Sequence, residues 1–184
     1  MNKIEEYKQE KDGLDILQDI PRYAAEGWEK ITDGDKERLK WAGVFFRRQT
    51  PGRFMMRLRV PNGFMTAIQL RTIGEISGEF GKGFTDITTR QQMQLLWFTI
   101  NDVPAIWERL RVVDLLSLQT GMDNIRGVIG CPVAGLTPNE LFDASAVVHE
   151  DADIDDSAHI GAQVTIEAGA VVKAGAVIDA GCFI

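Results

Sequence analysis

Aliphatic side chains recur at every sixth position near the C-terminus of this 184-residue chain, at Val148, Ile154, Ile160, Ile166, Val172, Ile178 and Ile184. Small or compact residues stand four positions after each of the first six, at Ala152, Ala158, Val164, Ala170, Ala176 and Cys182. A period of six matches neither the period of about 3.6 residues of an α-helix nor the two-residue alternation of a flat strand. It predicts a coil of short strands, each of which directs one aliphatic side chain into a narrow interior.

This hexad spacing resembles that of the hexapeptide-repeat acyltransferases over residues 146–184. The resemblance implies a short left-handed parallel β-helix, in a domain that we expect at residues 144–184. The repeated columns only line the interior, so they indicate a fold and not a function. His149 and His159 occupy different columns, which favours exposed polar positions over a shared general base. Because solenoids need about three or more repeats to bury a continuous core, we expect this short segment to associate as a homo-oligomer.

The net charge of −7 is concentrated in the same C-terminal segment. From Asp143 onward the chain has eight acidic residues and one base, Lys173, so acids and bases balance in residues 1–142. Because the Arg/Lys-rich part is neutral as a whole, we expect no binding to nucleic acid. The break in charge near Asp143 also predicts a domain boundary there.

Targeting and cysteine signals are sparse. No apolar run approaches the roughly 20 residues that cross a bilayer, and the N-terminus lacks the apolar centre of a secretory signal. We therefore expect a cytoplasmic protein that binds no membrane.

Cys131 and Cys182 are the two cysteines, too few for a disulfide framework, a four-thiolate zinc site or an iron–sulfur cluster held by this chain alone. No metal site is predicted.

The first part of the chain combines helical and strand periodicities, which predicts an α+β fold. We expect a helical arm at residues 1–40 and a second domain at residues 41–143. Within that domain the patterns predict strands at 54–60, 87–98 and 124–129. They predict helices at 66–80 and 103–118, the latter opened by Pro104.

Cations and neutral hydrogen-bond donors gather on the predicted strands. Strand alternation places Arg57 and Arg59 on one face of the strand at 54–60, with Arg126 just upstream of the glycine-rich segment that follows the last strand. One face of the strand at 87–98 would carry Thr88, Arg90, Gln92 and Gln94. Such a surface suits a small anion or a ligand with several carboxylates, because guanidinium groups pair with such oxygens.

Residues 5–143 closely resemble the N-terminal third of the ferredoxin-dependent nitrite reductase family, with several motifs in the family's order. The motifs include Arg59 followed by Val-Pro-Asn-Gly, the stretch from Thr89 to Gln94, and Asp-Asn-Ile-Arg ending at Arg126. The resemblance implies a nitrite/sulfite reductase ferredoxin-like half domain. It also implies reduction of nitrite to ammonia, with ferredoxin as the partner that donates electrons, on a siroheme bridged to a 4Fe–4S cluster.

The resemblance assigns roles to five residues of this chain. Arg59 and Arg126 match the arginines that bind the substrate anion. Thr88, Arg90 and Gln94 match residues that contact siroheme. These assignments rest on the family's motifs, and each residue also has a plainer interpretation: a solvated or polar strand face for Arg59, Thr88, Arg90 and Gln94, and a strand cap for Arg126.

The sequence departs from the family pattern at several points. Gln92 and Gly127 each stand where the family usually has Asn. The cluster cysteines and a lysine pair of the substrate pocket are absent from this sequence, and Cys131 fits a small buried residue better than a cluster ligand. The resemblance therefore implies an oxidoreductase that is inactive as this single chain.

Two other classes of protein remain open from sequence. One is a hexapeptide-repeat acyltransferase with an unrelated N-terminal domain, and the other is a non-enzymatic assembly or chimeric protein. The colour of the purified protein separates them, because siroheme absorbs visible light whereas the two alternatives are colourless.

Overall fold

The computed structural model describes residues 2–131, 147–148, 152–161, 164–167 and 169–178. The chain forms two compact units, Met1–Ile129 and Gly130–Ile184, and each is described by itself. No helix in the described part of the chain is long and apolar enough to cross a membrane.

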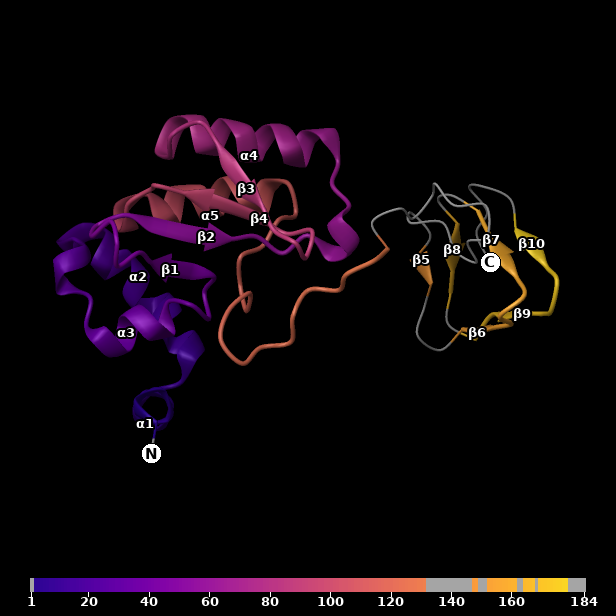
Figure 1. The fold of residues 1–184 in the computed structure, drawn as a ribbon, viewed down its shortest axis with the longest axis horizontal. Helices are drawn as coiled ribbons and strands as arrows, with labels where there is room; N and C mark the ends of the chain where they lie inside the picture. Colours follow the sequence, from indigo (N-terminus) through magenta and orange to yellow (C-terminus); the bar gives the residue numbers. More distant parts are fainter. Residues whose placement is uncertain (1, 132–146, 149–151, 162–163, 168, 179–184) are drawn as a thin grey trace. The chain divides into compact units, whose positions relative to one another are not determined.

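A four-stranded antiparallel sheet forms the centre of the first unit (Figure 1). Its strands lie in the order β1-β2-β4-β3, and they span Val44–Phe46, Phe54–Arg57, Met93–Leu96 and Thr85–Ile87 respectively. Helices α4 (Ala67–Phe80) and α5 (Val103–Val112) cover one face of this sheet. The α+β class predicted from sequence is confirmed for this unit.

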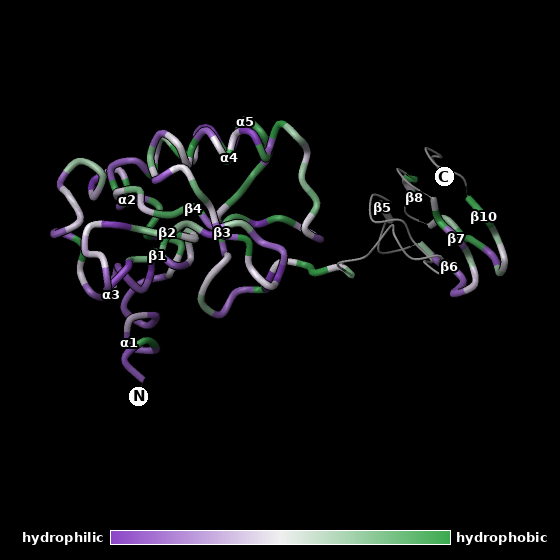
Figure 2. The backbone as a smooth tube through the Cα atoms, turned by 45° about the horizontal axis from the view of Figure 1, so that its top comes forward, coloured by the Kyte–Doolittle hydropathy of each residue, from purple (hydrophilic) through white to green (hydrophobic). Residues whose placement is uncertain are grey.

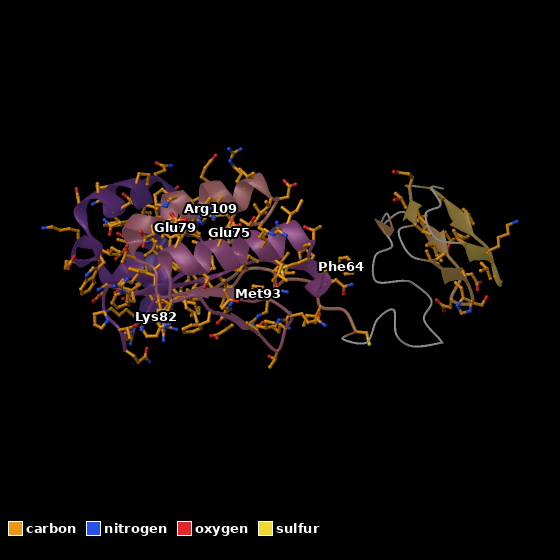
Figure 3. The ribbon with its side chains drawn as sticks, turned by 90° about the horizontal axis from the view of Figure 1, so that it is seen from above. Phe64, Glu75, Glu79, Lys82, Met93 and Arg109 are labelled. Atoms are coloured by element: carbon orange, nitrogen blue, oxygen red, sulfur yellow. The ribbon has the colours of Figure 1, made fainter. Side chains whose placement is uncertain are left out.

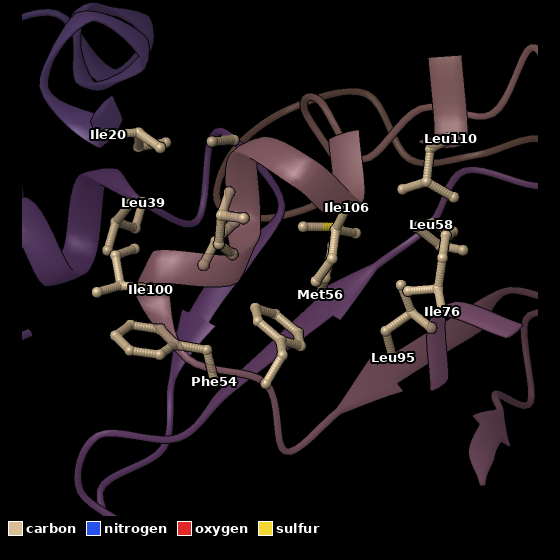
Figure 4. Close-up of a cluster of buried hydrophobic side chains, with 14 of the residues drawn as sticks. Ile20, Leu39, Phe54, Met56, Leu58, Ile76, Leu95, Ile100, Ile106 and Leu110 are labelled. Carbon is tan, nitrogen blue, oxygen red and sulfur yellow. The ribbon is translucent and has the colours of Figure 1, made fainter. Parts of the chain in front are cut away.

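Alternation along β2 decides which face of the sheet packs against the helices. Phe54, Met56, Leu58 and Val60 are fully buried, whereas Arg57 and the other residues between them are partly exposed. Figure 4 shows Ile106 and Leu110 of α5 over Met56 and Leu58. The opposite face of the sheet, which carries Arg57, is therefore left for other contacts.

The helical segment before β1 belongs to the same hydrophobic core. It contains α1 (Lys3–Glu10), α2 (Ile16–Glu26) and α3 (Asp33–Arg38). Ile16 and Ile20 of α2, together with Leu39, have no exposed surface and pack in the core that contains Phe54. Helices α1 and α3 are largely hydrophilic (Figure 2). The helical arm expected at residues 1–40 thus shares the core of the first unit through the apolar side of α2.

Helix α4 begins as its sequence predicts. Thr66 accepts a hydrogen bond from the Gln69 N–H while the Gln69 side chain accepts one from the Thr66 N–H, which forms a capping box. Glu75 and Glu79 of α4 pair with Arg109 of α5 at 3.1 and 2.5 Å (Figure 3). These ion pairs are exposed, so they orient the two helices more than they stabilise them.

Three predicted elements are wrong in extent or kind. Residues 87–98 are not one strand, because a turn at 88–92 separates β3 from β4 in a hairpin. The helix predicted to reach residue 118 ends at Val112, where Asp114 adopts a left-handed φ of 55° and the Leu115 N–H returns to the Leu110 carbonyl. Residues 124–129 form no strand, because their backbone joins no sheet ladder.

The second unit contains three two-stranded parallel sheets. Strand β5 (Val147–Val148) pairs with β8 (Thr165–Ile166), β6 (Asp153–Ile154) with β9 (Val171–Val172), and β7 (His159–Ile160) with β10 (Val177–Ile178). In every pair the partners are 18 positions apart in sequence. That separation equals three hexads, the length expected for one turn of the coil.

Side chains of the six-residue columns fill the interior of the second unit. Its buried cluster consists of Ala158, Ile160, Val164, Ile166 and Val172. Gly169 and Gly175 have positive φ angles of 77° and 70°, which explains why glycine recurs at these turns. The Val148 side chain, Cys182 and Ile184 lie outside what the structure describes, as does His149.

Candidate anion-binding site

A hollow of about 330 Å³ opens on the sheet face that the helices leave free. Three arginines line it, Arg57, Arg90 and Arg126, and its lining contains no carboxylate. The remaining polar side chains of the lining are neutral donors and acceptors, at Thr88, Thr89, Gln92, Gln94, Gln119, Thr120 and Asn124. Such a donor set favours a negatively charged ligand.

Three segments that are distant in sequence build this hollow. Arg57 at the end of β2 lies opposite Gln94 of β4 in the antiparallel register, so both side chains project from the same face. The turn at 88–92 adds Thr88 and Arg90, and the loop that follows α5 adds Arg126.

Arg57 is held in the hollow without a counter-ion. Its guanidinium lies 4.9 Å from the centroid of the Phe45 ring, and Nη1 donates a 3.4 Å hydrogen bond to the Thr120 carbonyl. Its Nε is buried and has no hydrogen-bond partner among the described residues. Burial, and secondly the positive charge of Arg126, lower the pKa of Arg57. A bound anion would relieve both effects.

The other two arginines differ in how firmly they are held. Arg90 Nη2 donates a 3.2 Å hydrogen bond to the Gly127 carbonyl, which ties the turn at 88–92 to the loop after α5. Arg126 is exposed, and its side chain makes no hydrogen bond or ion pair with another described residue. Arg126 therefore has a guanidinium available for a ligand.

Backbone strain is concentrated around the hollow. Gln91, Gln119 and Met122 have positive φ angles of 59°, 55° and 58°, a conformation that costs non-glycine residues energy. Between the last two, a Cβ on Gly121 would lie 2.7 Å from both the Lys40 carbonyl oxygen and the Phe45 ring. The loop can therefore approach the sheet this closely only with glycine at position 121.

The structure brings together four of the five residues predicted for the site. Thr88, Arg90, Gln94 and Arg126 all line the hollow. The shared strand face predicted for Thr88 and Arg90 is wrong, because both residues lie in the turn at 88–92 and not on a strand. Arg57 also lines the hollow, and strand alternation had placed it on the expected cationic face without giving it a role.

Arg59 is engaged elsewhere. Its Nη2 donates to the carbonyls of Gln119 at 2.8 Å and Ile125 at 3.2 Å, and its backbone N–H bonds to Leu116. Arg59 does not line the hollow. In this structure it fixes the loop that carries Arg126.

A second, larger hollow of about 680 Å³ lies between α1, α3 and the residues after β1. Its cations are partly neutralised, because Lys36 pairs with Asp33 at 3.0 Å and Lys40 pairs with Glu37. Its net attraction for an anion is weaker than that of the smaller hollow, even though it is larger.

Among the described residues, no group of three or more His, Cys, Asp or Glu side chains could hold a metal. Cys131, expected to be buried, is exposed.

Residues 46–113, which include β2, α4, the hairpin of β3 and β4, and α5, match the family profile of the nitrite/sulfite reductase ferredoxin-like half domain. The first unit contains this half domain. The half domain contributes Arg57, Thr88, Arg90 and Gln94 to the hollow.

Proteins similar to this chain are named as nitrite reductases. It is 47% identical over 150 residues to a ferredoxin–nitrite reductase of Synechococcus elongatus and 43% identical over 153 residues to a chloroplastic one of Zea mays. These matches cover 80% and 78% of this chain but 29% and 27% of the relatives. The chain therefore spans less than a third of their length.

A solved structure shows the same similarity in three dimensions. The Mycobacterium tuberculosis NirA protein superposes with a TM-score of 0.69 at 34% sequence identity. The superposition covers 76% of this chain and 29% of that protein. The shared part thus includes more than the half domain alone.

Proposed function

We propose that the half domain forms one wall of the anion- and siroheme-binding site of a ferredoxin-dependent nitrite reductase. The observation that carries the proposal is the hollow with three arginines and no carboxylate in its lining. The names of the similar proteins supply the reaction, and the hollow supplies a place for its anions. Nitrite is then the substrate and ferredoxin the electron-donating partner.

The residues of the hollow fit the acetate and propionate groups of siroheme. Arg57 presents a buried Nε that has no partner among the described residues, and Arg90, Thr88 and Gln94 add donors on the same side of the sheet. Guanidinium groups pair with carboxylates more specifically than ammonium groups do. Bound siroheme would supply the electron transfer to nitrite, while these side chains would hold and orient it.

We propose that Arg126 contacts the substrate anion, because its guanidinium is exposed at the hollow without a partner among the described residues. Arg59 supports this role through the two carbonyls that it binds in the same loop. Its direct contact with the anion stays a prediction.

The 4Fe–4S cluster does not fit this chain. The sequence contains two cysteines, and the described one, Cys131, is exposed and belongs to no cluster of metal-binding side chains among the described residues. We propose accordingly that the 184-residue chain alone does not reduce nitrite.

For the second unit we propose a left-handed parallel β-helix of the hexapeptide type. The separation of 18 residues between paired strands and the buried aliphatic column support it. We also propose that this unit mediates homo-oligomerisation and that the protein is cytoplasmic. No described residue favours an acyltransferase, so that activity is not proposed.

The proposed function is tested by titrating siroheme into the purified chain and following its visible absorbance. The triple variant Arg57→Ala, Arg90→Ala, Arg126→Ala should bind at least tenfold more weakly, since one charge-assisted hydrogen bond contributes roughly 1.5–3 kcal/mol. The control is Arg71→Ala, Arg109→Ala, Arg111→Ala, which removes the same charge from α4 and α5. Equal weakening by both triples would show that only net charge matters. Nitrite turnover by the chain alone with reduced ferredoxin would contradict the proposed need for further parts.

A further inference from the structure

The side chain of Gln92 is buried between the turn at 88–92 and the end of β2. Its Oε1 accepts a 2.8 Å hydrogen bond from the Val60 N–H, and its Nε2 donates to the carbonyls of Val60 at 2.7 Å and Arg90 at 3.0 Å. The Gln92 amide thus binds both backbone polar groups of Val60, as a neighbouring strand would. Because Val60 is fully buried and its carbonyl also accepts from the Gly63 N–H at 3.1 Å, loss of these bonds would leave the Val60 N–H unsatisfied.

Gly127 approaches this amide from the other side. A Cβ at position 127 would lie 3.0 Å from Gln92 Oε1, closer than side chains normally approach. The φ angle of Gly127 is not in the left-handed region, so a side chain at this position would be opposed by crowding against the Gln92 amide and not by backbone conformation. The Gly127 carbonyl accepts the hydrogen bond from Arg90 Nη2.

The two positions at which the sequence departs from the family pattern are therefore in contact. A side chain at position 127 would crowd the Gln92 amide, and a shorter side chain at position 92 would lose its hydrogen bonds to Val60 and Arg90. A longer amide at position 92 fills the space that a side chain at position 127 would otherwise occupy.

We propose that Gln92 and Gly127 are a coupled pair of positioning residues for the anion site. Gln92 sets the turn that carries Arg90, and Gly127 lets the segment after Arg126 come close enough to accept the Arg90 hydrogen bond. Neither residue needs to touch the ligand. This inference rests on the proposed function for the ligand class, but the contact between the two residues stands independently of it.

Citrate, a multi-carboxylate probe, tests the pair by calorimetric titration of the full chain at constant salt. Gly127→Ala should weaken citrate binding about tenfold, which corresponds to the loss of one charge-assisted hydrogen bond. Gln92→Asn should also weaken it, because the shorter side chain cannot reach Val60 and Arg90 together. The double variant should bind more tightly than the product of the two single effects predicts, because the shorter amide makes room for the new methyl group. Additive losses would overturn the coupling.

Gly74→Ala is the matched control, since a Cβ at that α4 position meets no atom within 4 Å. It should leave citrate affinity unchanged. Equal affinity of the parent and Gly127→Ala, with both folded by their thermal unfolding, would contradict the positioning role.

A second measurement needs no ligand. The hydrogen bond from Arg90 to the Gly127 carbonyl should slow rotation of the Arg90 guanidinium, and 15N NMR should show faster rotation in Gly127→Ala. Unchanged rotation would overturn the inference. If the parent binds neither citrate nor siroheme while the rotation changes as expected, the proposed function fails and the coupled pair stands.

Discussion

Arg57 and Arg126 line one hollow as like charges, and Arg126 adds to burial in lowering the pKa of the Arg57 guanidinium. No carboxylate in the lining of the hollow offsets this repulsion. The folded chain thus bears an electrostatic cost that a bound anion would remove. Such an arrangement favours ligand binding over the stability of the ligand-free protein.

Replacement of Arg126 should separate these two properties. Arg126→Gln removes the repulsion, so the ligand-free protein should unfold at a slightly higher temperature at low salt. The gain in the free energy of unfolding should be less than about 1 kcal/mol, because the group is exposed. The same variant should bind siroheme more weakly. Thermal unfolding and siroheme titration measure the two effects, with Arg111→Gln as a control that breaks an exposed pair with Glu108. A lower unfolding temperature for Arg126→Gln would mean that Arg126 is favourably paired.

A buried network in the helical segment should dominate the acid stability of the first unit. Burial opposes the ionised form of Asp35, but hydrogen bonds from Tyr23 at 2.5 Å, Arg38 at 3.0 Å and Thr32 at 2.9 Å outweigh it and lower its pKa. Because the folded pKa lies below the unfolded one, Asp35 stabilises the fold above about pH 4, and this contribution is lost as the pH falls through the folded pKa.

Asp35→Asn should therefore destabilise the first unit by about 3 kcal/mol at neutral pH, since it removes the buried carboxylate that pairs with Arg38 at 3.0 Å. It should also flatten the dependence of stability on pH in the acid range. Urea unfolding between pH 3 and pH 7 measures both. Asp33→Asn, on the exposed side of the same helix, should have a much smaller effect on both, because water screens its ion pair with Lys36. Equal effects of the two substitutions would show that the buried network is not what sets acid stability.

The buried side of β2 and the hexad coil follow local patterns that the sequence predicts, whereas it predicts neither β1 nor the hairpin of β3 and β4. Alternation identifies the buried side of β2, and the six-residue columns anticipate the pairing of strands three hexads apart. The turn at 88–92 could not be predicted in this way, because it contains no Gly, Pro or Asn. It depends on the Thr88 side chain, whose Oγ1 accepts the Gln92 N–H, and on Gln91 in a left-handed conformation.

The site depends more on long-range contacts than the fold does. Arg59 and Arg57 stand on the same strand face, yet only Arg57 faces the hollow, because Arg59 binds carbonyls 60 and 66 positions away in sequence. No pattern near residue 59 contains that information. The cations and neutral donors on the predicted strands, with few acids among them, indicated an anion surface, and the tertiary contacts decide which arginines form it.

The coil of the second unit should respond to substitutions by column. Ile166 is 1% exposed and central in the buried cluster, so Ile166→Asp should place an unpaired carboxylate in the interior and destabilise the unit by several kcal/mol. Lys173→Asp, at an exposed position beside β9, should not. Amide hydrogen exchange over residues 153–178 of the full chain measures the difference. Similar protection in both variants would mean that the hexad columns do not specify this unit.

The central claim is that Arg57 and Arg90 bind the carboxylates of siroheme, with Arg126 beside them for the substrate anion. Side-chain 15N NMR of the arginines during a siroheme titration tests it most directly, because each guanidinium reports separately. The signals of Arg57, Arg90 and Arg126 should shift together and saturate at one equivalent, and the Arg57 Nε–H should become protected from exchange. The signals of Arg71, Arg109 and Arg111 should not move. If siroheme binds while the Arg57 signal stays unchanged, the cofactor lies elsewhere and the account is wrong.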